Sequence, residues 1–348
     1  MHIREYLVRA AEAMTQRALV ELPSPAEWAR QLPAKRAQFH EMLGIDRWMA
    51  AERTPLNVQV TGTLQREGFR IELLHYESLP GLYVAANLYV PDGLKGRAPG
   101  LVYVCGHSLD QKVNYQDHAR RFAQLGFVVL IVDTIELGEV RGNHHGTHRY
   151  GWFNWISRGY TPAGVEVWNA MRGFDLLAAR DDVDAERLGI TGTSGGGAIT
   201  WWTAVADERV KVAAPSCGTA TTASHVRERT VDGHCDCMFP ANLYGWSLLE
   251  MSALVAPRPL LIASAGLDGI FTIAAIEEFY ARLKGLYRHL GRPDDINLVT
   301  FAGPHSYHEA TRTGIVSWFV RHLQGGAATP ATVGDIDGVR ESAADLAV

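Results

Sequence analysis

The sequence predicts an α/β protein with one core, in which helices cover both faces of a mostly parallel sheet that starts with antiparallel strands. From about residue 99 onward, short apolar runs without alternation recur, as they do in strands that are buried on both faces. Amphipathic helical stretches separate most of these runs, and this alternation is typical of a parallel sheet with right-handed crossovers. The length of 348 residues suits one large domain of this kind with extensions.

The first 55 residues are predicted to form a helical extension. Apolar residues recur at helical spacing over 3–20 and again over 24–43. Ser24 and Pro25 suit the N-cap and the first position of the second helix. Pro33 is expected to break that helix, because proline lacks a backbone donor.

The main domain is predicted to span 56–324. It begins with three runs of strand character that turn residues separate, which indicates an antiparallel meander. These runs are 56–64, 69–76 and 81–90. The buried strands expected after them are 101–105, 127–132, 188–191, 210–214, 260–263 and 296–301. The expected helices are 117–125, 164–180, 273–290 and 311–323.

Two insertions and a tail lie outside this pattern. Residues 138–162 and 218–246 lack clear periodicity and each follows a predicted strand. Both are therefore expected on the rim at the C-terminal ends of the strands, where open α/β sheets bind ligands. The last stretch, 325–348, is rich in Gly, Ala, Thr and Asp, and we expect a flexible tail.

The overall composition excludes several functional classes. A net charge of −5 without a long basic run does not suit a nucleic-acid-binding protein. The apolar runs fall far short of the ~20 residues of a membrane span, and the start of the chain lacks the features of a secretory signal. Four cysteines are too few for a disulfide scaffold of this size. We therefore expect a cytoplasmic protein without nucleic-acid or membrane partners.

The sharpest motif is GTSGGG at 192–197, between the strand run LGIT and the helix-forming run AITWWTAVA. Gly-x-Ser-x-Gly thus stands in the strand–turn–helix context in which such a serine acts as a nucleophile. An abrupt turn strains the serine backbone and leaves room only for glycine beside it. A phosphate loop is the weaker interpretation, because no Gly-Lys-Ser/Thr ending follows. We predict Ser194 as the nucleophile, with its hydroxyl at a helix N-terminus that can stabilise an oxyanion.

The acid and the base are expected further along the chain, in the order Ser, acid, His. Asp268 in SAGLDGIF directly follows the strand run PLLIA, and His305 in GPHSYHE directly follows INLVTF. Both residues should therefore lie on the same edge of the sheet as Ser194. His305 would take the serine proton, and Asp268 would orient His305 and stabilise its charged form. Four further residues are weaker candidates: a second histidine that starts the next helix, an acid that follows no strand, and two glutamates on a solvated helix face. These are His308, Asp236, Glu277 and Glu278.

The oxyanion hole is expected to combine the N–H of Gly195 with one from the loop CGHS at 105–108. We favour the backbone N–H of His107. The side chain of His107 either lines the pocket or caps the following loop, and the sequence leaves both open. Ser108 is a further candidate for contact with the substrate.

The insertions carry aromatic, histidine and cysteine residues whose roles are open. Trp152 and Trp155 could stack on a sugar ring, although packing within a lid is an equally good interpretation. Histidine and cysteine are zinc ligands, but the HHGTH motif holds a glycine within a loop, and no second cysteine pair completes a site. We therefore expect no metal and no cofactor, and expect Cys235 and Cys237 to pack in the cap over the pocket. The histidines concerned are His144, His145 and His148.

Together these motifs resemble a bacterial α/β-hydrolase group of acetyl xylan esterase-like and related carbohydrate esterases. The resemblance implies an α/β-hydrolase fold, a catalytic triad of Ser194, Asp268 and His305, and ester hydrolysis through an acyl-enzyme. Cys105 stands where many hydrolases have the His of a His-Gly pair, at a position that we expect to be structural. The similarity spans about 56–323 and is carried by GTSGGG (192–197), DERVKVAAPSC (207–217), HCDCMFP (234–240), ALVAPRPLLIASAGLDGIF (253–271) and GPHSYHE (303–309).

The leading hypothesis is a serine carboxylic ester hydrolase that acts on small acyl or methyl esters of carbohydrates or similar polar alcohols. Its substrate would be a small-molecule or oligosaccharide ester. A serine peptidase of the prolyl-oligopeptidase type shares such a domain, but usually carries a β-propeller that about 55 helical residues cannot build. A non-catalytic binding protein on a hydrolase scaffold is the third hypothesis, and a complete triad argues against it.

Overall fold

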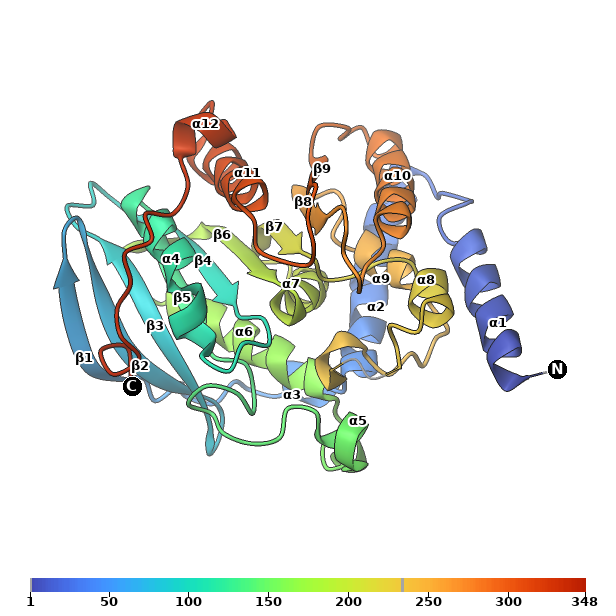
Figure 1. Ribbon diagram of the computed structural model, residues 1–348, viewed down its shortest axis with the longest axis horizontal. Helices are drawn as coiled ribbons and strands as arrows, with labels where there is room; N and C mark the ends of the chain where they lie inside the picture. The colour runs from blue at the N-terminus through green and yellow to red at the C-terminus, as the bar shows by residue number, and fades with distance from the viewer. Residues whose placement is uncertain (1, 233–234) are drawn as a thin grey trace.

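A nine-stranded sheet forms the centre of the computed structural model, which describes residues 2–232 and 235–348 (Figure 1). The strand order is β1-β2-β3-β5-β4-β6-β7-β8-β9. The strands β1, β2 and β3 pair in an antiparallel manner, and β3 is also antiparallel to β5. All pairs from β5 to β9 across the sheet are parallel. The predicted α/β-hydrolase fold, with antiparallel strands at one edge, is thus confirmed.

The elements follow one another as the apolar pattern predicts. The strands are β1 (Gln59–Arg66), β2 (Phe69–Leu79), β3 (Leu82–Pro91), β4 (Ala98–Val104), β5 (Val128–Val132), β6 (Val183–Thr193), β7 (Val210–Ser216), β8 (Leu260–Ala265) and β9 (Ile296–Phe301). The helices are α1 (Ile3–Arg17), α2 (Pro25–Leu43), α3 (Asp46–Ala50), α4 (Gln111–Gln124), α5 (Gly146–Tyr150), α6 (Pro162–Ala178), α7 (Gly195–Ala206), α8 (Thr222–Arg227), α9 (Leu248–Ala253), α10 (Ile273–His289), α11 (Glu309–Phe319) and α12 (Pro330–Val333). Short helical turns are η1 (Ile156–Arg158), η2 (Asp236–Met238) and η3 (Val320–Gln324).

Helices bury both faces of the sheet, in two hydrophobic cores. In β4, Val102 and Val104 face the core that α2, α6, α7, α9 and α10 complete. The alternate residues Leu101 and Tyr103 face the core that α4, α11 and α12 complete. Because successive strand residues point to opposite faces, a strand covered in this way must be apolar throughout. No helix among the described residues is long and apolar enough to cross a membrane.

Helix α2 continues through Pro33, so the predicted break there is wrong. Ser24 caps the helix by accepting a hydrogen bond from the N–H of Glu27, and Pro25 occupies the first turn. Pro33 is exposed to solvent, whereas Trp28 and Phe39 on the same helix are buried in the core. The burial of this apolar face outweighs the one backbone hydrogen bond that proline removes.

The C-terminal segment also differs from the expected flexible tail. After α12 it runs beside α4 and back toward the antiparallel edge of the sheet (Figure 1). Arg340 pairs with Asp117 of α4, and Glu341 pairs with Arg66 of β1. Leu346 is fully buried in the second core. A few apolar and charged residues anchor the segment, although its composition is typical of a mobile one.

The two insertions follow β5 and β7 and contact each other at the C-terminal edge of the parallel strands. Helix α5 of the first insertion and α6 both contact the turn η2 of the second. The base of the first insertion is held by a buried ion pair between Lys112 Nζ and Asp133 Oδ2, 3.0 Å apart. Asp133 also accepts the N–H of Glu139. This bracing role agrees with the position of Asp133 directly after β5.

Candidate active site

Ser194 lies at the sharp turn between β6 and α7. Its backbone has φ 60° and ψ −121°, in the left-handed half of conformational space, which a side chain other than glycine rarely adopts. The Ser194 N–H donates to the carbonyl of Ser216 in the neighbouring strand, at 2.9 Å. The parallel sheet therefore sustains the strained turn, and the turn directs the hydroxyl away from the sheet.

The glycines of the motif are required by the close approach of other backbone segments. A Cβ on Gly196 would lie 2.1 Å from the carbonyl oxygen of Val104, and one on Gly197 would lie 2.2 Å from that of Ser216. Since these are main-chain atoms of sheet strands or of their ends, they cannot move aside cheaply. The tight packing that positions Ser194 thus excludes any larger residue here.

We expect Gly196→Ala to lower the free energy of unfolding by about 3 kcal/mol and to reduce ester hydrolysis. The matched control is Gly285→Ala in α10, where an added Cβ meets nothing within 4 Å. That change should stabilise the protein by about 0.5–1 kcal/mol, because alanine favours helix. Urea unfolding of both variants measures the difference, and equal stabilities would contradict the crowding argument.

The structure brings Ser194, His305 and Asp268 into one hydrogen-bonded row. His305 Nε2 lies 3.0 Å from Ser194 Oγ, and His305 Nδ1 lies 2.7 Å from Asp268 Oδ2. The three residues follow β6, β9 and β8, whose C-terminal ends meet at one edge of the sheet. A hydroxyl, an imidazole and a carboxylate in this order can pass a proton away from the serine oxygen.

The environment of Asp268 keeps its side chain charged. Burial by itself would raise the pKa of Asp268, but the hydrogen bond from His305 and the N–H groups of Ile270 and Phe271 outweigh it and hold the pKa below its ordinary value. Nearby, burial followed by the charge of Asp268 raises the pKa of the Cys217 thiol to about 12. Cys217 therefore stays a neutral thiol beside the carboxylate.

The loop that carries His305 is anchored by the residues that follow it. His308 caps α11 by accepting the N–H of Ala310, and its ring stacks on Phe301 with ring centroids 4.4 Å apart. Tyr307 hydrogen-bonds to Nδ1 of the buried His118 of α4. The weaker acid candidates lie elsewhere: Glu277 and Glu278 are exposed on α10, and the side chain of Asp236 lies outside the described part of the structure.

We predict that His118 makes the fold sensitive to acid. Burial, followed by the nearby charge of Arg312, lowers the pKa of His118 to about 3, and the charge of Asp335 only partly opposes this. In the unfolded chain the pKa of a histidine is about 6.5. At a pH between these two pKa values, the unfolded state binds a proton that the folded state does not. The contribution of neutral His118 to the free energy of unfolding is therefore fully present above about pH 6.5 and is lost as the pH falls toward 3.

Between pH 6.5 and 4, the free energy of unfolding of the unmodified protein should fall by about 3 kcal/mol more than that of His118→Gln. Glutamine keeps an acceptor for Tyr307 but does not titrate. Urea unfolding of both proteins across this range measures this difference. Parallel stability curves for the two proteins would show that His118 does not contribute.

The predicted oxyanion loop lies against the nucleophile turn. The imidazole of His107 packs over Gly195, since a Cβ on that glycine would lie 2.1 Å from His107 Nε2. The ring also faces Cys237 Sγ at 3.2 Å. The two roles considered for this side chain, lining the pocket and capping the following loop, both stay predictions. The oxyanion role of the Gly195 and His107 N–H groups stays a prediction, as does the role of Ser108, whose hydroxyl accepts the N–H of Asp110.

The two candidate stacking residues lie on the first insertion. Trp152 is 45% exposed and packs beside Tyr150, with ring centroids 5.1 Å apart. Trp155 is half-buried beside Tyr160, at 5.7 Å. Both rings thus have an aromatic neighbour and remain accessible, and their contact with a substrate stays a prediction.

Among the described residues, the structure adds Cys217 to Asp268 and His305, and it assembles a second group that the sequence analysis did not combine. His107, His144, Cys235 and Cys237 place their nitrogen and sulfur atoms within 4.8 Å of one another. His145 is adjacent but not part of this group, His148 has no described side chain, and His234 lies outside the described residues. In the sequence, the Cys-x-Cys and His-His patterns indicated possible metal ligands, but His107 lies far from both patterns along the chain.

Comparisons with known proteins agree with the fold. The sequence profile of the prolyl oligopeptidase family matches residues 113–323, which include all three residues of the row. A protein of Bacillus subtilis named as a hydrolase, YtaP, is 24% identical over 301 residues, which are 80% of this chain and 97% of that protein.

Solved structures of esterases share the fold at low sequence identity. A methylesterase superposes with a TM-score of 0.73 at 23% identity, over 93% of this chain and 72% of its own. A Bacteroides fragilis protein described as an acetyl xylan esterase gives 0.67 at 16% identity, over 86% and 83%. A glucuronoyl esterase from Solibacter usitatus gives 0.62 at 16% identity, over 77% and 86%.

Proposed function

Because this chain belongs to the prolyl oligopeptidase family of hydrolases, we propose that it is a serine hydrolase that cleaves carboxylic esters through an acyl-enzyme. The observation that carries the proposal is the row of Ser194, His305 and Asp268, with distances of 3.0 and 2.7 Å between successive partners. The strained backbone of Ser194 supports it further, since such strain clusters at functional sites.

In the proposed mechanism, Ser194 Oγ attacks the ester carbonyl while His305 Nε2 takes its proton. The N–H groups of Gly195 and His107 would hold the negative oxygen of the tetrahedral intermediate, and Asp268 stabilises the imidazolium that forms. His305 then returns the proton to the leaving alcohol, which leaves an acyl-enzyme. Water, activated by His305 in the same way, releases the acid and restores Ser194.

For the substrate, we propose small acyl or methyl esters of carbohydrates or similar polar alcohols. The support is the similarity of fold to a methylesterase, an acetyl xylan esterase and a glucuronoyl esterase. The accessible rings of Trp152 and Trp155 on the rim agree with this proposal, because sugar rings pack well on aromatic faces.

The family also includes peptidases by its name, so peptide hydrolysis is the second candidate. Both candidates predict covalent labelling by a fluorophosphonate at Ser194, whereas a non-catalytic binding protein would not label. A panel of acetylated sugars, methyl uronates, nitrophenyl acetate and a prolyl peptide amide separates them. We expect kcat/KM to be highest for an ester of a polar alcohol. Faster turnover of the peptide than of every ester would contradict the proposal.

A further inference from the structure

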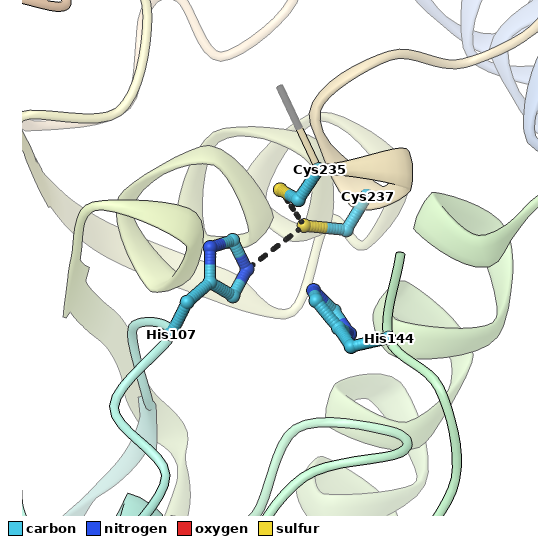
Figure 2. Close-up of side chains that lie close together, drawn as sticks. All are labelled: His107, His144, Cys235 and Cys237. Carbon is cyan, nitrogen blue, oxygen red and sulfur yellow. Dashed lines mark hydrogen bonds between the residues drawn. The ribbon is translucent and has the colours of Figure 1, made fainter. Parts of the chain in front are cut away.

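Three loops that are far apart in the sequence meet beside the nucleophile turn. His107 follows β4, His144 lies in the first insertion, and Cys235 and Cys237 flank the start of η2 in the second. Figure 2 shows these four side chains directed toward one another, with Cys237 between Cys235 and His107. All four potential ligand atoms lie within 4.8 Å of one another. Two imidazoles and two thiols converge here without being part of the row of Ser194, His305 and Asp268.

The spacing of these atoms suits a single tetrahedral metal ion. His107 Nε2 lies 3.2 Å from Cys237 Sγ, and the Sγ atoms of Cys235 and Cys237 lie 2.8 Å apart. Around zinc, bonds of about 2.0–2.3 Å place neighbouring ligand atoms roughly 3.3–3.8 Å from one another. Side-chain shifts of about 1 Å would therefore bring all four atoms to bonding distance of one ion.

The orientation of His144 is the one that metal-bound histidines adopt. Its Nδ1 lies 2.9 Å from the backbone carbonyl oxygen of Ile135, which holds the proton on that nitrogen. The other ring nitrogen then carries the lone pair, and Figure 2 shows a ring nitrogen of His144 directed toward the sulfurs. Metal-ligating histidines commonly donate their second N–H to a carbonyl or a carboxylate. The carboxylate of Glu166, buried on α6, is also near, with Oε1 3.9 Å from His144 Nδ1.

Burial and charge favour a structural site over a catalytic one. His144, Cys235 and Cys237 are each less than 5% exposed. Two thiolates and two neutral imidazoles balance the charge of a divalent ion, which a buried site requires. Four protein ligands also fill the tetrahedral coordination of zinc and leave no position open for water or substrate.

We propose that His107, His144, Cys235 and Cys237 bind one Zn²⁺ ion that joins the two insertions to the loop after β4. The ion would fix the loop of His107 against Gly195, next to Ser194, and so hold the rim in shape. The proposal does not depend on ester hydrolysis, because it concerns metal binding and the stability of the rim.

A disulfide between Cys235 and Cys237 is the competing explanation for the two close sulfurs. Their separation of 2.8 Å is longer than the ~2.05 Å of a disulfide, and none of the four cysteines forms a disulfide in the structure. A disulfide would also give no reason for the convergence of His107 and His144. The two explanations differ in mass and in metal content, so one preparation can separate them.

The test is to produce the full chain in zinc-supplemented medium and to measure metal by mass spectrometry under native and denaturing conditions. We expect about one zinc per chain, with X-ray absorption showing two sulfur and two nitrogen ligands. Substitution with Co²⁺ should give the visible bands of a tetrahedral thiolate site. A chain that takes up neither Zn²⁺ nor Co²⁺, or one that is two mass units lighter with an oxidised Cys235–Cys237 pair, would overturn the proposal.

Variants assign the ligands. Cys235→Ser, Cys237→Ser and His144→Ala should each lower zinc affinity at least about 10-fold. Cys105→Ser and His145→Ala, which change a cysteine and a histidine outside the group, should retain the metal, and loss of zinc in either control would overturn the assignment. If a ligand variant fails to fold, a chelator added to the unmodified protein should lower Tm, and Zn²⁺ should restore it; an unchanged Tm would count against a structural ion. Ser194→Ala should keep its zinc, which separates this result from the outcome for catalysis.

Discussion

Replacing Ser194 with alanine is expected to lower kcat for nitrophenyl acetate by about 10⁵-fold or more, since the attacking oxygen is lost. The fold should be unaffected. Alanine carries the same Cβ as serine, so the strain at φ 60° is the same in both proteins. The free energy of unfolding should therefore change by less than about 1 kcal/mol, the worth of the hydrogen bond to His305.

The matched control is Ser306→Ala, which removes an exposed hydroxyl next to His305 that donates to the nearby carbonyl of Pro304. Its kcat should remain within about twofold of the unmodified enzyme. Steady-state kinetics and circular dichroism of both variants decide the matter. If Ser194→Ala retains a tenth of the original kcat, a different residue is the nucleophile.

The second large effect is expected for Asp268→Asn, with a fall in kcat of about 10⁴-fold. The reason lies in the contacts of the two carboxylate oxygens. Oδ1 accepts the N–H groups of Ile270 and Phe271, so the carbonyl oxygen of the new amide would remain there. The NH₂ group would then face His305 Nδ1 and act as a donor, where the carboxylate is now an acceptor. The imidazole would carry its proton on Nε2 and could no longer accept the proton of Ser194.

This prediction is checked by the kinetics of nitrophenyl acetate hydrolysis and by ¹⁵N NMR of the histidine tautomer. Asp236→Asn, a change at the weaker acid candidate in the second insertion, serves as the control and should leave kcat near its original value. A large loss in the control together with a small loss in Asp268→Asn would identify a different acid.

The sequence was sufficient for the fold class and for the three residues of the row because both depend on local signals. A strand buried on both faces is apolar throughout, and parallel strands all end at one edge of the sheet. A reactive side chain directly after such a strand therefore lies at that edge, which is how Asp268 after β8 and His305 after β9 meet Ser194. The spacing of the glycines around Ser194 was a further local signal, because a crowded turn requires glycine at these positions.

Only the tertiary structure decided the features that depend on packing between distant segments. Helix α2 passes through Pro33 because its other face is buried, and the C-terminal segment is held by Leu346 and by ion pairs with α4 and β1. The meeting of His107 with Cys237, 130 residues later, likewise follows from how two insertions fold over the rim. Such contacts cannot be seen as a periodic pattern in the sequence. The free energy that favours them comes from the packing of whole elements and not from the local preferences of the chain.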